Sequence, residues 1–129
     1  MTKAYIVAKV GYEYNDEGYA PMGRFGTLYE DISEVYLDRS VAKRKQLDNT
    51  KAIVREVAGD FYGFSQYSYE EPEIGDVNNE SLEEIFGEGY AEDNEYRMFI
   101  PAEATDEQVE AVANLLGDTF FEIIEIEIQ

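Results

Sequence analysis

Residues 105–128, with the sequence TDEQVEAVANLLGDTFFEIIEIEI, carry the clearest structural pattern in the chain. Thr105 and Gln108 have the spacing of a capping box, in which two side chains satisfy backbone groups at the start of a helix. The apolar residues that follow recur at helical spacing up to Gly117, which predicts a helix that buries Val109, Val112, Ala113 and Leu116. Phe120–Ile128 then alternates isoleucine with glutamate, which predicts a strand with one inward and one outward face.

Two other long elements precede this stretch. The alternation within Tyr5–Tyr14 predicts a first strand, whose one face carries Ile6, Ala8, Val10, Tyr12 and Tyr14. Asp38 or Ser40 can cap a helix that continues to about Val57, with a basic outer stripe. Shorter elements are predicted as a hairpin or one irregular strand within Phe25–Leu37, strands over Phe61–Tyr69 and Tyr96–Ile100, and a short helix from Ser81 to Gly87. Loops are predicted over Gly18–Gly26, Glu70–Asn79 and Gly87–Glu95.

The order of the main elements, β-α-β-β-α-β, predicts a single α+β domain over residues 1–129. The natural candidate is a small ferredoxin-like sandwich, with four antiparallel strands and two helices on one face. An extra hairpin or loop follows its first strand, and the helix at Ser81 is an addition to the basic order. In such a sheet the first strand pairs with the last. An apolar fraction of 44% is enough to build one core despite the high charge.

The composition excludes several classes of chemistry. The chain has no cysteine and no histidine, so it has no disulfide, no thiolate or imidazole metal site and no histidine-based catalytic triad. We therefore expect no catalytic residue, no metal and no cofactor, and we predict that the protein is not an enzyme. Its apolar runs are too short for a membrane span and its start has no signal-peptide pattern, so we expect a cytoplasmic protein without membrane contact.

The charge is divided unevenly along the chain. Residues 1–57 hold nine acids and nine bases, whereas residues 58–129 hold twenty acids and one base, Arg97. The whole net charge of −19 therefore comes from the second part. A solvated acidic surface that aids solubility is the simple interpretation. Like charges repel one another, however, and neutral polar residues would give solubility at a lower cost in stability.

The charge pattern leads to a hypothesis about the partner. We expect an acidic protein-binding module whose carboxylates imitate a polyanion such as a nucleic acid and inhibit a basic nucleic-acid-handling protein, as in counter-defence by phages or mobile elements. Direct binding of nucleic acid is not expected, because phosphate would be repelled. The acids predicted to bind the partner are Glu70, Glu71, Glu73, Asp76, Glu80, Glu83, Glu84, Glu88, Glu92, Asp93 and Glu95. Tyr67 and Tyr69 adjoin them and are predicted as interface anchors.

One other function fits parts of the pattern, and a second fails. A self-associating or small-ligand-binding ferredoxin-like domain without catalysis is the alternative, with the basic helix docking on the acidic region of a second copy to form a homodimer. A calcium loop is disfavoured: an EF-hand that begins at Asp76 needs glycine at position 81 and glutamate at position 87, where the chain has Ser81 and Gly87.

Overall fold

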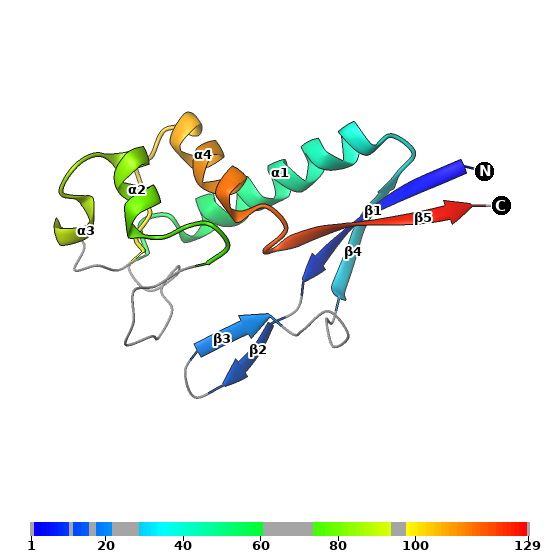
Figure 1. Ribbon diagram of the computed structural model, residues 1–129, viewed down its shortest axis with the longest axis horizontal. Coiled ribbons are helices and arrows are strands. Elements are labelled where there is room, and N and C mark those ends of the chain that lie inside the picture. The colour runs from blue at the N-terminus through cyan, green and yellow to red at the C-terminus, as the bar shows by residue number, and fades with distance from the viewer. Residues whose placement is uncertain are drawn as a thin grey trace.

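A three-stranded antiparallel sheet forms one part of the computed structural model (Figure 1). The structure describes residues 2–10, 12–15, 18–21, 29–60, 74–93 and 98–128, with the backbone alone for 12–15, 18–21 and 29–34. The sheet has the order β4-β1-β5, formed by Tyr29–Tyr36, Thr2–Val10 and Phe121–Ile128. β1 and β5 pair over their whole length, which confirms the predicted pairing of the first strand with the last.

The predicted first strand, Tyr5–Tyr14, is in fact two strands of different sheets. β1 ends at Val10, and β2 (Tyr12–Asn15) pairs with β3 (Gly18–Pro21) in a separate two-stranded sheet. The prediction of a loop from Gly18 was therefore also wrong. Alternation has the same period of two on both sides of the break, so it does not reveal that the chain changes sheets. β4 is the irregular strand expected within Phe25–Leu37, and its pairing with β1 shifts register twice.

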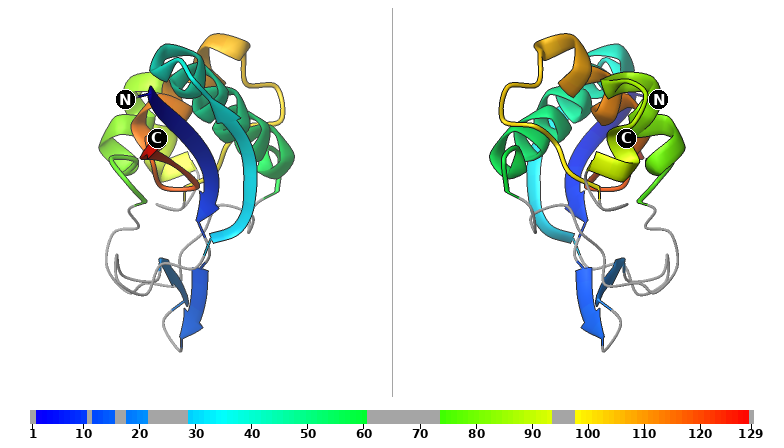
Figure 2. Two further views of the ribbon diagram at one scale, coloured as in Figure 1. Left: turned by 90° about the vertical axis from the view of Figure 1, so that its right-hand side faces the viewer. Right: turned by 90° about the vertical axis from the view of Figure 1, so that its left-hand side faces the viewer.

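The helix α1 (Arg39–Val57) lies across one face of the sheet (Figure 2). Asp38 is its N-cap: its side chain accepts a hydrogen bond from the backbone N–H of Ser40 at 2.8 Å. The hydrogen bonds from Ser40 also lower the pKa of the Asp38 carboxyl, because they favour its charged form. Val7 of β1 packs against Ala42 of α1, so the odd-numbered residues of β1 face the helix.

A second apolar cluster lies where the other helices meet the end of α1. It includes Val54 of α1 and residues of α2 (Asn79–Phe86) and α4 (Asp106–Leu116). The capping box of Thr105 and Gln108 is present as predicted, and α4 buries the four apolar residues expected of it. None of the described helices is both long and apolar enough to cross a membrane.

The predicted strand over Tyr96–Ile100 is wrong for the part that the structure describes. Met98 and Ile100 are buried in the helical cluster, as the alternation suggested, but residues 98–100 form no strand. The physical reason is that the N–H and C=O of Phe99 bond to the hydroxyl of Tyr90 rather than to a neighbouring strand. The mixed α+β class is therefore confirmed, whereas the ferredoxin-like order is not: β4 precedes α1 and occupies the same sheet. The predicted strand over Phe61–Tyr69 lies outside the described residues.

Candidate acidic surface

A tight turn joins the segment before α2 to the end of α4. Ile74 and Val77 exchange backbone hydrogen bonds at 3.0 and 2.9 Å, and between them Gly75 has a φ of +60°. The N–H of Asp76 donates to the carbonyl of Leu115 at 3.1 Å. This contact fixes the start of the acidic segment against α4.

The helix α2 begins earlier than the sequence pattern suggested. Its N-cap is Asn78, whose side chain accepts from the N–H of Ser81, while the Ser81 hydroxyl accepts from the N–H of Asn78, each at 2.8 Å. Asn78 is therefore the cap, and Ser81 is the third residue of the helix. The short amide side chain of Asn78 accepts the hydrogen bond from the backbone N–H of Ser81 that a cap provides. Leu82 points into the core with no exposed area. The helix ends at Gly87 as predicted.

The short helix α3 (Tyr90–Asp93) occupies a stretch that was predicted to be a loop. Its position depends on Tyr90, whose ring stacks on Phe86 with centroids 5.4 Å apart. The Tyr90 hydroxyl accepts from the N–H of Phe99 at 2.7 Å and donates to the carbonyl of the same residue. A helix of four residues is too short to be stable by itself, so α3 depends on this tertiary contact.

The described acids on and between α2 and α3 lie together at one end of the molecule (Figure 1), and Asp76 precedes them at the turn against the end of α4. Figure 1 shows α2 and α3 at the end that lies opposite the chain termini. All the described acids are exposed except the half-buried Glu83, and they are Asp76, Glu80, Glu83, Glu84, Glu88, Glu92 and Asp93. None of these seven forms an ion pair with a lysine or arginine in the part of the chain that the structure describes. Glu70, Glu71, Glu73, Glu95, Tyr67 and Tyr69 fall outside the described residues.

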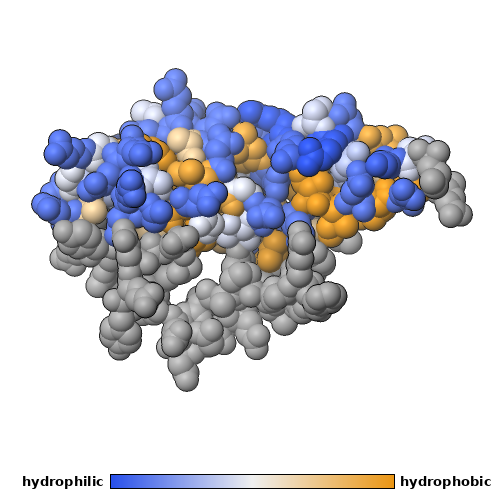
Figure 3. All heavy atoms as spheres, viewed as in Figure 1, coloured by the Kyte–Doolittle hydropathy of each residue, from blue (hydrophilic) through white to orange (hydrophobic). Residues whose placement is uncertain are grey.

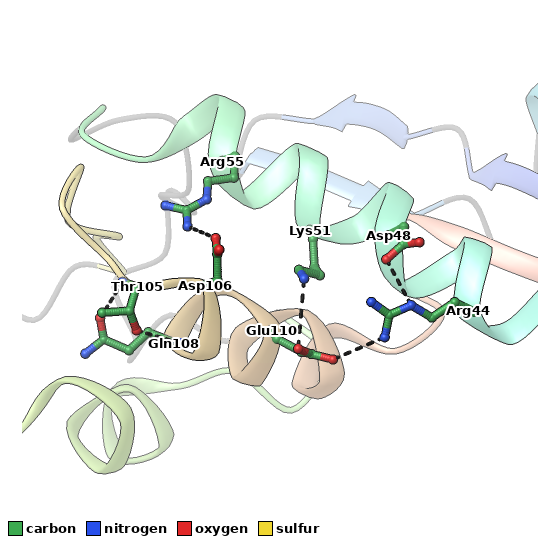
Figure 4. A network of polar contacts seen from close by, with 8 residues as sticks. All are labelled: Arg44, Asp48, Lys51, Arg55, Thr105, Asp106, Gln108 and Glu110. Carbon is green, nitrogen blue, oxygen red and sulfur yellow. Dashed lines mark hydrogen bonds and ion pairs between the residues drawn. The ribbon is translucent and has the colours of Figure 1, made fainter.

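The acids that face α1 are, by contrast, neutralised within the chain (Figure 4). Arg44 and Lys51 of α1 share Glu110 of α4, with N···O distances of 3.5 and 3.9 Å. Arg55 pairs with Asp106 at the start of the same helix. Arg44, Lys51 and Arg55, which form the predicted basic stripe, thus each contact an acid of α4 in the same chain.

A hollow of about 260 Å³ opens beside α3. It combines two aromatic residues with three carboxylates from two separate segments, namely Phe86, Glu88, Tyr90 and Asp93 on one side and Pro101, Glu103, Ala104 and Gln108 on the other. Two of the predicted acids, Glu88 and Asp93, are brought together here with Glu103, which sequence reasoning did not select. Nothing in the local pattern marks Glu103, because its neighbours in the hollow come from another part of the chain. Aromatic faces beside carboxylates form a favourable site for a cationic side chain.

Among the residues that the structure describes, no three carboxylates converge closely enough to hold a metal ion. Comparison of the chain with protein-family models, with curated proteins and with solved structures yields no match. The functional interpretation therefore depends on the surface itself.

The substitution Tyr90→Phe is expected to lower the free energy of unfolding by about 1–3 kcal/mol, because it removes the hydroxyl that bonds both backbone groups of the half-buried Phe99. Burial also raises the pKa of Tyr90 to about 12 from 10.0. A raised folded pKa means that this stabilisation is complete below pH 10 and is lost as the pH rises toward 12. Urea denaturation at pH 8 and at pH 11 should therefore show a smaller loss of stability with pH for the variant than for the wild type. An equal loss in both proteins would contradict this role of the hydroxyl.

Proposed function

We propose that the protein is an acidic protein-binding module that occupies the basic nucleic-acid groove of a partner and so competes with nucleic acid. The single observation that carries this proposal is the contrast between the two groups of acids. Those that face α1 are paired within the chain, whereas the seven on and around α2 and α3 are not. Pairing within the chain compensates part of the charge of a carboxylate, whereas an exposed unpaired carboxylate keeps its full charge to steer and orient a cationic surface.

The arrangement of charges on α2 supports a role in binding a partner rather than in stabilising the helix. Glu80 lies one helical turn from Glu83 and Glu84, and like charges at this spacing destabilise a helix by about 0.2–0.5 kcal/mol per pair. The last turn of α2 has no basic residue to complement the helix dipole. Glu80 in the first turn suits the helix dipole, whereas Glu83 and Glu84 in the last turn oppose it. A basic partner would relieve the repulsion on binding.

The hollow beside α3 adds a defined binding position to the negative electrostatic field of the acidic surface. Its three carboxylates, Glu88, Asp93 and Glu103, offer a place for a lysine or arginine side chain of the partner. A net charge of −19 makes direct binding to phosphate unfavourable, so nucleic acid enters this proposal as the competitor and not as the ligand.

The test compares two variants that remove the same number of charges. The surface variant carries Glu80→Gln, Glu84→Gln and Glu92→Gln, and the control variant carries Asp48→Asn, Glu56→Gln and Glu110→Gln, which lie on α1 or face it. A partner is first captured from nuclease-treated host extract on the wild-type protein at low ionic strength, eluted with salt and identified. Its affinity for the three proteins is then measured by titration, with duplex DNA as the competitor.

We expect the surface variant to bind about ten- to hundredfold more weakly than the wild type, with a shallower dependence on salt. The control variant should bind within about threefold of the wild type, because rim charges far from an interface contribute little. DNA should displace the wild-type protein from the partner. Equal weakening of both variants, or a complex that DNA does not displace, would contradict the proposal.

A further inference from the structure

β5 is an edge strand with backbone groups that point away from the sheet. It pairs with β1 on one side only among the described strands. The N–H of Val10 donates to the carbonyl of Phe120, and in the same register the even-numbered residues of β5 bond to β1. The N–H and C=O groups of Ile123, Glu125 and Glu127 therefore face the outer edge. Gln46 already donates to one outward carbonyl, that of Phe121, at 2.7 Å.

The two faces of β5 differ sharply in chemistry. Ile123 packs with Val7 on the side of α1, so Glu125 and Glu127 share that side and are exposed. The opposite side carries isoleucines at alternate positions, of which Ile126 is 38% and Ile128 43% exposed. Figure 3 shows a hydrophobic area over the end of the sheet that β1 and β5 form. Because Ile126 and Ile128 are partly exposed, the apolar side chains of an added strand can pack beside them at the edge.

The inner edge of β5 shows what kind of strand it accepts. β1 places Lys3 opposite Glu127 on the acidic side, and Lys3 forms an ion pair with Glu125 at 3.6 Å. On the other side β1 places Ala4 and Ile6 opposite the isoleucines of β5. Basic residues beside glutamates and apolar residues beside isoleucines are the favourable cross-strand pairs. The outer edge presents the same two faces and the same backbone groups.

We infer that the outer edge of β5 binds an extended segment of a basic partner protein, in which lysine or arginine alternates with apolar residues. The added strand bonds to the outward groups of Ile123, Glu125 and Glu127, as in other cases of strand addition to a sheet edge. A second copy of this chain is a poor occupant, because antiparallel pairing of two β5 edges brings glutamates of the two copies side by side. This surface is separate from the acidic α2–α3 end and does not depend on its function.

The test uses short synthetic peptides and the full-length protein. The first peptide alternates lysine and valine over about eight residues, the usual length of a strand. The second has the same composition with the lysines in one block, and the third alternates glutamate and valine. Amide hydrogen exchange is followed by NMR. We expect the first peptide alone to slow exchange at Ile123, Glu125 and Glu127, while Ile124 and Ile126, which already bond to β1, serve as internal controls.

Two variants test the backbone and the charge separately. Glu125→Pro removes one outward N–H and should abolish the protection, whereas Glu125→Gln keeps the N–H and should weaken binding only a few-fold.

The double variant Glu125→Lys and Glu127→Lys tests the charge preference of the edge. It should reverse this preference, so that the glutamate peptide binds about tenfold more tightly than the lysine peptide.

Four results would overturn the inference: no protection by the lysine peptide, equal protection by the blocked peptide, an unchanged preference in the lysine variant, or a dimer in sedimentation that protects the edge without peptide. The variant with Glu80, Glu84 and Glu92 changed to glutamine should keep the peptide-induced protection. Failure at this edge is therefore distinguishable from failure of the proposed function.

Discussion

The substitution Leu82→Ala is expected to lower the free energy of unfolding by about 2–5 kcal/mol. Leu82 is completely buried in the helical cluster, where it joins the inner side of α2 to Val109 and Met98. Removing its side chain loses the transfer free energy of the buried atoms and leaves a cavity that the surrounding helices only partly fill. Urea denaturation followed by circular dichroism measures the change directly.

The exposed position Glu84 on the same helix provides the matched control. Glu84→Ala changes neither the core nor a described ion pair, so its effect should stay within about 0.5 kcal/mol of the wild type. If Leu82→Ala cost no more than this control, α2 would not be anchored as the structure has it. The placement of the acidic surface depends on that anchor, so the core variant should also weaken binding of the partner.

The substitution Gly75→Ala is expected to cost about 2–4 kcal/mol, because it combines backbone strain with a steric clash. Gly75 has a φ of +60°, a conformation that residues with a side chain rarely adopt. A Cβ atom at this position would lie 2.8 Å from the hydroxyl oxygen of Thr119 and 3.2 Å from the carbonyl oxygen of Leu115. The turn would have to move away from α4, with which it makes the contact that fixes the start of the acidic segment.

Gly117 separates the two contributions to this cost. It has a similar φ of +54° with a ψ of −116°, which residues with a side chain rarely adopt, but a Cβ atom there meets nothing within 4 Å. Gly117→Ala should therefore cost only the strain of the backbone, about 1–3 kcal/mol, and thermal or urea denaturation of the two variants shows whether Gly75→Ala carries an additional steric cost. Equal losses for both variants would show that the turn at Gly75 does not pack against the end of α4.

The local patterns of the chain predict much of the secondary structure. The capping box at Thr105, the alternation of Phe120–Ile128 and the cap at Asp38 each depend on residues that are near in sequence, and the structure confirms them. The same kind of pattern predicts that the acids from Asp76 to Asp93 form a charged segment. Their gathering on α2 and α3 follows, because consecutive elements of a short segment stay close together.

Contacts between distant residues account for what the sequence did not reveal. Arg44 and Glu110 are far apart in the chain, so only the packing of α1 on α4 shows that the basic stripe is neutralised. Tyr90 forms a helix within an acidic stretch because its hydroxyl holds Phe99. The periods, the caps and the uneven charge follow from the order of residues along the chain, since these are properties of neighbouring residues. Among the described residues, the ion pairs of the acids and the position of β5 at the sheet edge follow only from folding, since both depend on contacts between distant parts of the chain.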